Sequence, residues 1–153
     1  MSKIETRLAE LGLALPEVAA PVAAYVPAIA MNGRALTSGQ LPFVSGQLPA
    51  AGKVGAEVSL EQAQQLAATS VLNALAAIKQ EIGDLDRITR VVKVVVFVAS
   101  DPKFTQQPVV ANGASELLGK IFGDRGQHVR SAVGVAVLPL DAPVELELEV
   151  GYQ

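Results

Sequence analysis

The run of residues 87–99 constrains the fold of this chain more than any other segment. It is rich in β-branched side chains, and Lys93 is the only charged residue between Val91 and Ala99. Such a run is typical of a central strand that is buried on both faces of a sheet. It is too short to cross a membrane, which takes roughly 20 apolar residues. The sequence therefore predicts a protein built around this strand, with no membrane partner.

Helical periodicity predicts a long helix on each side of this strand. Ser59 is a typical N-cap, Gln62 occupies the capping-box position, and residues 60–82 then carry apolar side chains at helical spacing. Residues 108–122 open on proline and carry a second apolar stripe, and both segments are followed by glycine. A shorter amphipathic helix is expected over residues 4–11.

Four further strands complete the predicted pattern. Residues 25–30 and 35–38 flank an Asn-Gly dipeptide at 32–33, which is typical of tight hairpins. Residues 130–138 and 144–150 alternate with the period of a strand. The order helix, two strands, helix, strand, helix, two strands predicts an α+β fold, in which the helices pack on one face of a mixed β-sheet.

The chain length fits a single domain over residues 1–153. Residues 1–15 are expected to form an N-terminal helical extension, joined by a Pro/Ala-rich link at 16–24. Half of all residues are apolar, which is a large share for a chain without a membrane span. We therefore expect part of the apolar surface to be buried between subunits.

The composition excludes several classes of function. The chain has no cysteine and one histidine, so thiol nucleophiles, zinc–thiolate sites and multi-histidine metal sites are ruled out, and neither metal nor cofactor is expected. The lack of cysteine is typical of the reducing cytoplasm. A net charge of −3, with four Phe, two Tyr and no Trp, argues against a nucleic-acid partner, because RNA binding depends on phosphate neutralisation and base stacking.

A few charged residues are candidates for a site. Glu145, Glu147 and Glu149 share one face of the last predicted strand, and no Lys or Arg follows Arg130 in the sequence. An ordinary solvated strand face explains the glutamates, and a rim arginine that reaches water explains Arg130. The functional alternative for Arg130 is a carboxylate clamp. His128 has no Asp, Ser or Cys pattern around it and fits a loop histidine better than a catalytic one.

Several short motifs follow one another in a recognisable order. They are Tyr25-Val26, Thr-Ser-Gly-Gln-Leu-Pro at 37–42, the strand at 91–99, Asn112, Arg-Ser at 130–131, Leu-Pro at 138–139, Asp141 and Val-Glu-Leu-Glu at 144–147. Together they resemble the RidA/YjgF family of reactive-intermediate deaminases, also called L-PSP endoribonucleases. The spacing from Arg130 to Glu145 is the most specific feature. The resemblance covers residues 25–151, which we take as the core.

This resemblance implies a chorismate-mutase-like fold, assembled as a homotrimer with active sites in the clefts between subunits. Family members hydrolyse enamine and imine intermediates to 2-keto acids and ammonia, without a metal or cofactor. The partners implied are therefore a small 2-imino or 2-keto acid and two further copies of the chain.

The resemblance also assigns roles to individual residues. Arg130 would bind the substrate carboxylate and Glu145 would orient the attacking water. The substrate-binding residues would be Tyr25 and Asn112, which line the cleft, Ser38, the backbone of Gly39, and the backbone of Ala132. Two departures from the family pattern stand out: Ala132 replaces a frequent Cys, and His128 stands where many members have Pro.

The distance between Arg130 and Glu145 bears on assembly. If residues 130–138 and 144–150 formed one hairpin, the two side chains would lie on the order of 23 Å apart. Either the two strands are not paired as a hairpin, or the residues meet from different subunits, and we favour the second.

Two other functions stay open at this point. One is an endoribonuclease, a name that some family members carry. The other is a non-catalytic trimer that binds small carboxylates or acts like a chaperone.

Overall fold

The computed structural model of the protein describes residues 2–18, 20, 21 and 23–153. The helices and strands occur in the predicted order: α1 (Lys3–Glu10), β1 (Ala28–Met31), β2 (Arg34–Thr37), α2 (Leu60–Ile82), β3 (Ile88–Ala99), α3 (Gln107–Phe122), β4 (Val129–Val135) and β5 (Val144–Tyr152). Short 3-10 helices are η1 (Leu85–Arg87), η2 (Gly123–Gly126) and η3 (Pro139–Asp141). Ala19 and Val22, in the predicted link, lie outside the described residues.

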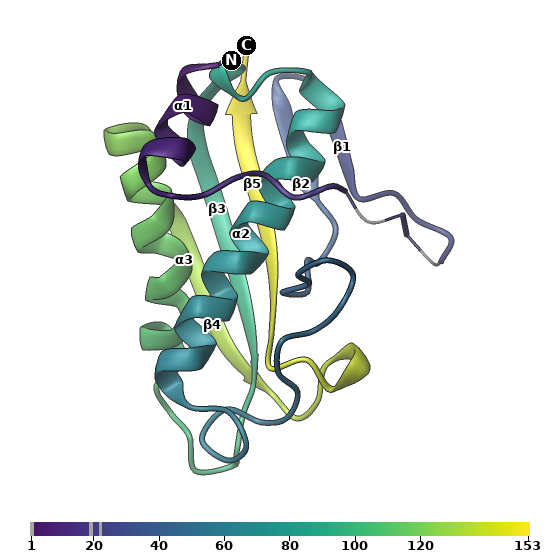
Figure 1. Cartoon of the computed structure of the whole chain (residues 1–153), viewed down its shortest axis with the longest axis vertical. Helices are drawn as coiled ribbons and strands as arrows, with labels where there is room; N and C mark the ends of the chain where they lie inside the picture. The colour runs from purple at the N-terminus through teal and green to yellow at the C-terminus, as the bar shows by residue number, and fades with distance from the viewer. Residues whose placement is uncertain (1, 19, 22) are drawn as a thin grey trace.

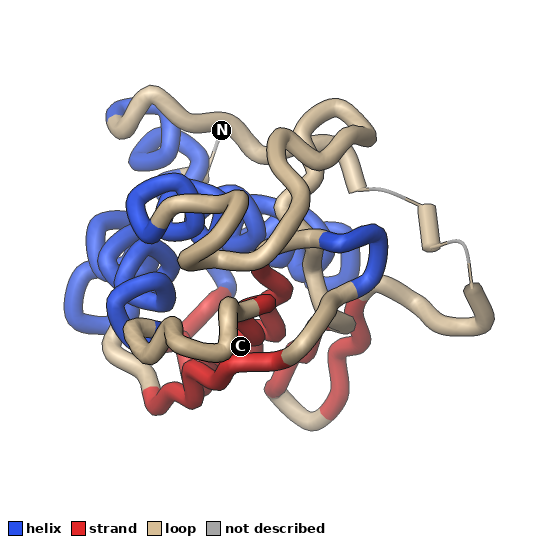
Figure 2. The backbone as a smooth tube through the Cα atoms, turned by 90° about the horizontal axis from the view of Figure 1, so that it is seen from below, coloured by secondary structure: helices blue, strands red, loops and turns tan. Residues whose placement is uncertain are grey.

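The strands form a mixed sheet in the order β1-β2-β5-β3-β4 (Figure 1). β3 is antiparallel to β5 on one side and parallel to β4 on the other. Figure 2 shows the helices as a layer on one side of the strands. The predicted α+β arrangement of a mixed sheet with helices on one face is therefore confirmed.

The Asn-Gly dipeptide forms the predicted hairpin turn. Met31 pairs with Arg34, so Asn32 and Gly33 alone connect β1 to β2. Both adopt left-handed backbone conformations, with φ of 54° and 76°. A two-residue loop of this type matches the right-handed twist of the flanking strands. β1 begins at Ala28, so Tyr25 and Val26 precede the strand instead of belonging to it.

The core lies between the helices and one face of the sheet. The apolar stripe predicted for the second long helix is buried: Val110, Ala114, Leu117, Leu118, Ile121 and Phe122. The long α2 begins as predicted, because Ser59 Oγ accepts a hydrogen bond from the Gln62 backbone N–H at 3.1 Å. Both helices cover the same side of the sheet, so they leave its other side without a helical layer.

The prediction that residues 87–99 are buried on both faces is wrong for the single chain. Val94, Val96 and Val98 of β3 are fully buried beneath the helices, whereas Val95 and Phe97 are only half-buried. We call the uncovered side the open face. The side chains on it include Ile29, Leu36, Val95, Phe97, Val133 and the three glutamates of β5.

β4 and β5 do not form a hairpin, since each pairs with β3, which lies between them. This is the first of the two alternatives that the spacing left open, and the separation estimated for a hairpin does not apply. β4 ends at Val135 instead of continuing to residue 138, because the β3 strand offers no partner beyond Ala99.

The predicted N-terminal helix is present as α1 and docks on the helical layer. Asp86 accepts hydrogen bonds from the backbone N–H groups of Ile4 and Lys3, each at 2.9 Å. The bond from Ile4, followed by the bond from Lys3, holds the pKa of Asp86 below its usual value despite some desolvation. Ile4 and Leu8 are buried in the core. Among the described helices, none combines the length and the apolar character that a membrane span requires.

Candidate functional site

Arg130 is held in place by α3. It pairs with Val94, which is buried beneath the helices, so its side chain lies on the helix-covered face of β4. Its Nη1 donates to Asn112 Oδ1 at 2.8 Å and to Ser115 Oγ at 3.1 Å. Its Nη2 donates to the carbonyl of Pro108 at 3.3 Å. The guanidinium is therefore anchored at three points instead of simply extending into water.

The anchored guanidinium keeps two donors for a ligand. Arginine has five N–H donors. The bonds to α3 use both protons of Nη1 and one of Nη2, which leaves Nε–H and the second Nη2 proton without an acceptor among the described residues. Two N–H groups on one guanidinium are what a carboxylate binds in a bidentate pair. Arg130 can therefore donate to a ligand without giving up its anchors.

Ser115 and His128 extend this arrangement, and the sequence reasoning missed both contacts. Ser115 Oγ lies 2.9 Å from His128 Nε2, and His128 Nδ1 lies 2.6 Å from the Gly126 carbonyl oxygen. Together with Arg130, these residues line a pocket of about 340 Å³ whose rim is formed partly by glycines. The spacing of Ser115 and Asn112, three apart on one helix face, was the signal available in the sequence.

Glu145 lies in a second region, on the open face of β5. It pairs with Phe97 of β3. The chain before Gln40 runs beside it, because Gln40 and Leu146 exchange backbone hydrogen bonds of 2.7 and 3.0 Å. Gly39 therefore packs directly against the Glu145 carboxylate, and a Cβ at position 39 would collide with it. Burial raises the pKa of Glu145, and the negative charge of Glu147 raises it further.

Tyr25 and Ser38 lie in this second region as well. The Ser38 hydroxyl donates to the Val26 carbonyl at 2.6 Å. This bond ties the end of β2 to the segment that precedes β1. Both residues line a hollow of about 310 Å³ with Ile29 and Leu36. The structure therefore groups Tyr25 and Ser38 near the strands that carry Gly39 and Glu145.

The candidate residues thus form two separate groups in one chain. Arg130 and Glu145 are separated by two inter-strand spacings and three positions along β3, about 14 Å between their Cα atoms. Their side chains lie on opposite faces of the sheet. Ala132 belongs to the Arg130 group, since it pairs with the buried Val96 and packs against the core. A small ligand cannot touch Arg130 and Glu145 of the same chain at once.

The three glutamates of β5 have distinct surroundings. Glu149 forms an ion pair of 3.1 Å with Arg34 of β2. On its other side, Glu149 is paired with Lys93 of β3 in the sheet register. The cations that the sequence lacks after Arg130 therefore come from neighbouring strands. In the part of the chain that the structure describes, no group of three or more His, Asp or Glu residues is placed to hold a metal ion.

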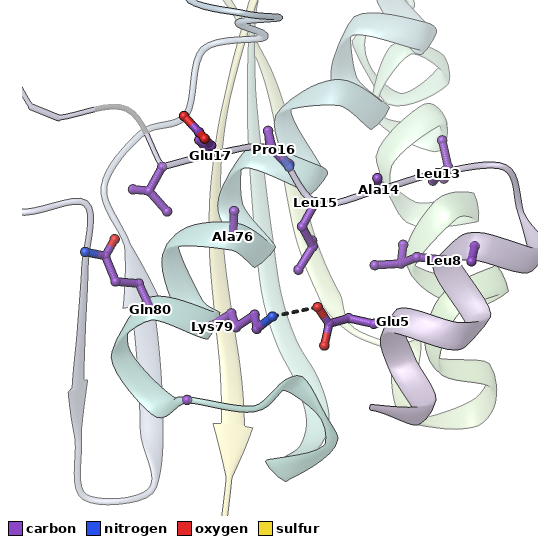
Figure 3. A pocket seen from close by; sticks show the side chains of 13 residues that line it. Glu5, Leu8, Leu13, Ala14, Leu15, Pro16, Glu17, Ala76, Lys79 and Gln80 are labelled. Atoms are coloured by element: carbon purple, nitrogen blue, oxygen red, sulfur yellow. Dashed lines mark hydrogen bonds and ion pairs between the residues drawn. The ribbon is translucent and has the colours of Figure 1, made fainter. Parts of the chain in front are cut away.

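A larger pocket than the one beside Arg130 contains none of the predicted site residues. It has a volume of about 850 Å³ and lies between α1, the following segment to Val18, and α2 (Figure 3). Leu8, Leu15 and Ala76 contribute apolar walls, and Lys79 Nζ donates to Glu5 Oε1 at 2.6 Å. This bond lowers the pKa of Glu5. The pocket's cation, Lys79, is already paired with Glu5, so the size of this pocket does not make it the better candidate for binding a carboxylate.

Comparisons with known proteins agree with this fold. Residues 5–148 match the model of the family described as "YjgF/chorismate_mutase-like, putative endoribonuclease". The match begins inside α1, whereas the resemblance carried by the sequence motifs begins only at residue 25. The chain thus carries the features of a small α+β family over nearly its whole length.

Individual relatives support the same assignment. Protein TCP17 of Trypanosoma cruzi is 42% identical over 148 residues, covering 95% of this chain and 91% of the relative. A RutC family protein of Synechocystis is 32% identical over 128 residues, with 84% and 85% covered. A crystal structure of a "putative endoribonuclease" from Shewanella oneidensis MR-1 has a TM-score of 0.94 at 33% identity, with 98% and 99% covered. The chain belongs to the YjgF/chorismate-mutase-like family.

Proposed function

We propose that this protein hydrolyses 2-imino acids, or the enamines in equilibrium with them, to 2-keto acids and ammonia. The observation that carries this proposal is the anchored Arg130, which keeps two unbonded N–H donors and lines a pocket. A guanidinium in this state selects small molecules with a carboxylate. The family resemblance supplies the reaction.

The chemistry needs little beyond orientation and one proton carrier. Water adds to the imine carbon and its first proton passes to the nitrogen, which gives a carbinolamine. The remaining hydroxyl proton is then transferred to the nitrogen, the C–N bond breaks with its electron pair leaving on ammonia, and the C–O bond becomes a carbonyl. A carboxyl such as Glu145 can take the proton from water and return it to nitrogen. Its raised pKa supports this role, because proton transfer is most efficient when the pKa of the carrier approaches the working pH.

We further propose that each site is completed by a second copy of the chain, in a homotrimer. Arg130 and Glu145 lie on opposite faces of one sheet, so one chain cannot bring them to one substrate. The open face carries exposed apolar side chains, with Ile29 and Val133 exposed by 48% and 44%. Burial of this face against another copy would remove apolar surface from water.

The activity can be tested directly. A threonine dehydratase generates 2-iminobutyrate in situ, and 2-keto acid formation is followed with the wild type, Arg130→Ala and the surface control Arg7→Ala. We expect acceleration by the wild type and by Arg7→Ala. Arg130→Ala should lose about 100-fold in kcat/KM, because hydrogen bonds to charged groups contribute about 1.5–3 kcal/mol each. Absence of acceleration by the wild type would refute the proposed function.

Subunit mixing tests the shared site. Arg130→Ala and Glu145→Ala proteins, each strongly impaired alone, are unfolded together and refolded as mixed oligomers. If each site takes Arg130 from one copy and Glu145 from another, some sites in the mixture are intact and activity returns. If no activity returns although mixed oligomers form, the two residues act within one chain or not together.

The endoribonuclease name of the family is a second candidate with a separate test. The net charge of −3 and the few aromatic residues argue against RNA as a substrate. Cleavage of RNA by the wild type that is lost in Arg130→Ala would overturn this argument. Saturable 2-keto acid binding without any turnover would instead support a non-catalytic carboxylate-binding protein.

A further inference from the structure

We propose that Ser115 and His128 are positioning residues that hold Arg130 in the orientation needed to bind a carboxylate. The effect expected on enzyme kinetics rests on the proposed function. The hydrogen bonds that connect His128, Ser115 and Arg130 do not depend on it. It assigns a role to His128, the only histidine in the chain. Neither residue is taken to touch the substrate.

The first link is the position of the proton on the His128 ring. A backbone carbonyl oxygen can only accept, and His128 Nδ1 lies 2.6 Å from the Gly126 carbonyl, so Nδ1 must carry a proton. In the neutral ring Nε2 is then an acceptor. With the ring neutral, the neighbouring Ser115 Oγ, at 2.9 Å, donates to Nε2.

The second link passes from Ser115 to the guanidinium. Because the Ser115 proton is committed to His128, the lone pairs of its oxygen remain to accept from Arg130 Nη1 at 3.1 Å. The hydrogen bonds run in one direction, from Arg130 to Ser115, to His128 and to Gly126. Without His128 the hydroxyl proton can rotate toward other acceptors, and the lone pair that holds Nη1 is no longer fixed.

The far end of this chain of bonds is rigid. Gly126 is buried in η2 and packs so closely on α3 that a Cβ would meet the Leu118 carbonyl. Its carbonyl is therefore a fixed acceptor, and Ser115 belongs to the same helix α3. Asn112 accepts from the same Nη1 as Ser115, and the Pro108 carbonyl accepts from Nη2. Ser115, fixed by His128, is therefore one of three acceptors on α3 that hold Arg130.

The kinetic test compares Ser115→Ala and His128→Leu with the conservative His128→Gln, whose side-chain oxygen can accept from Ser115 near the position of Nε2. A matched control is Thr69→Ala, which removes a hydroxyl that bonds only to its own helix. In the in situ assay with 2-iminobutyrate, we expect KM to rise about tenfold in Ser115→Ala and His128→Leu while kcat stays within about twofold, because loose anchoring weakens ground-state and transition-state binding equally. His128→Gln and Thr69→Ala should keep a KM close to that of the wild type.

If the wild type is active and Ser115→Ala has the KM of the wild type, this inference is overturned while the proposed function stands. A fall in kcat at constant KM would overturn it as well, since a merely structural defect or a catalytic role would have that effect. Inactivity of the wild type would instead refute the proposed function, and the structural part is then decided by a measurement that needs no substrate.

That measurement is NMR of the His128 ring in the ¹⁵N-labelled full chain, in which a single histidine gives an unambiguous signal. We expect the neutral ring to carry its proton on Nδ1, and side-chain N–H signals of Arg130 to show slow rotation in the wild type and fast rotation in Ser115→Ala. A neutral ring protonated on Nε2, or an Arg130 signal that Ser115→Ala leaves unchanged, would overturn the inference.

Discussion

The Arg130 region and the Glu145 region differ in how much of their geometry a single chain provides. Arg130 has three hydrogen-bond acceptors on α3 and lies beside a pocket with Ser115 and His128. Glu145 has a half-buried carboxylate that accepts no hydrogen bond from another described side chain, and its raised pKa reflects this burial. The Arg130 region is therefore preorganised within one chain. The Glu145 carboxylate lacks a hydrogen-bond partner among the described side chains, and a neighbouring copy or a ligand would supply it.

This difference follows from the layers of the fold. The helix-covered face of the sheet is packed against α2 and α3, and Arg130 finds its partners there within the chain. The open face has no covering layer, and its apolar and acidic side chains remain partly in water. If a second copy covers it, the surroundings of Glu145 change most and those of Arg130 change least.

The largest expected effect comes from the open face. Val133→Glu places a charge beside Phe97, its partner on β3. The single chain should still fold, because the Val133 side chain is partly exposed, but assembly should be lost because a buried, unpaired charge is costly in an interface. Light scattering should then give the mass of a monomer, and turnover should fall to the uncatalysed rate. An intact trimer with normal activity would show that this face is not the interface.

A smaller effect is expected from Gly39→Ala. The added methyl group must displace the flexible Glu145 side chain, so the fold survives while the carboxylate moves. We expect kcat to fall about tenfold with little change in KM, which is the opposite of the signature expected for Ser115→Ala. Circular dichroism should confirm that the variant is folded. A rise in KM with constant kcat would assign Glu145 to substrate binding and remove the contrast between the regions.

The smallest expected effect is on stability. Burial favours the neutral form of Glu145, so its folded-state pKa is raised and the charged carboxylate is a cost to folding at neutral pH. This cost is absent at a pH below the pKa of Glu145 in the unfolded chain. It develops as the pH rises from that pKa through the higher pKa of Glu145 in the folded chain. Glu145→Gln should therefore raise the free energy of unfolding at pH 7, by less than about 1 kcal/mol because water screens a half-exposed group.

The control for this prediction is the pH dependence itself. Thermal unfolding of the wild type and Glu145→Gln should converge as the pH falls below the pKa of the unfolded glutamate, where the carboxyl is neutral in both the folded and the unfolded chain. A variant that is less stable than the wild type at pH 7 would mean that Glu145 is stabilised as a carboxylate, for instance by a cation of another subunit.

Local features of the sequence were sufficient to determine the elements of this protein. Helical spacing after Ser59, the Asn-Gly turn and the strict alternation of β5 depend on neighbours a few residues apart, and each is confirmed. The motifs around Arg130 and Glu145 also identified the family, because short segments in a characteristic order can be recognised without knowledge of the fold. Whether those residues act as proposed stays a prediction.

Only the tertiary structure decided which residues meet. The position of β3 between β4 and β5 depends on pairing between strands that are distant in the chain, and local periodicity carries no information about it. That order separates Arg130 from Glu145 and leaves one face of β3 uncovered. It also places Ser115 at the guanidinium of Arg130 and His128 against Ser115, contacts that join separate segments of the chain. The sequence determined what each segment becomes, and the packing of helices on one side of the sheet decided which side chains share a site.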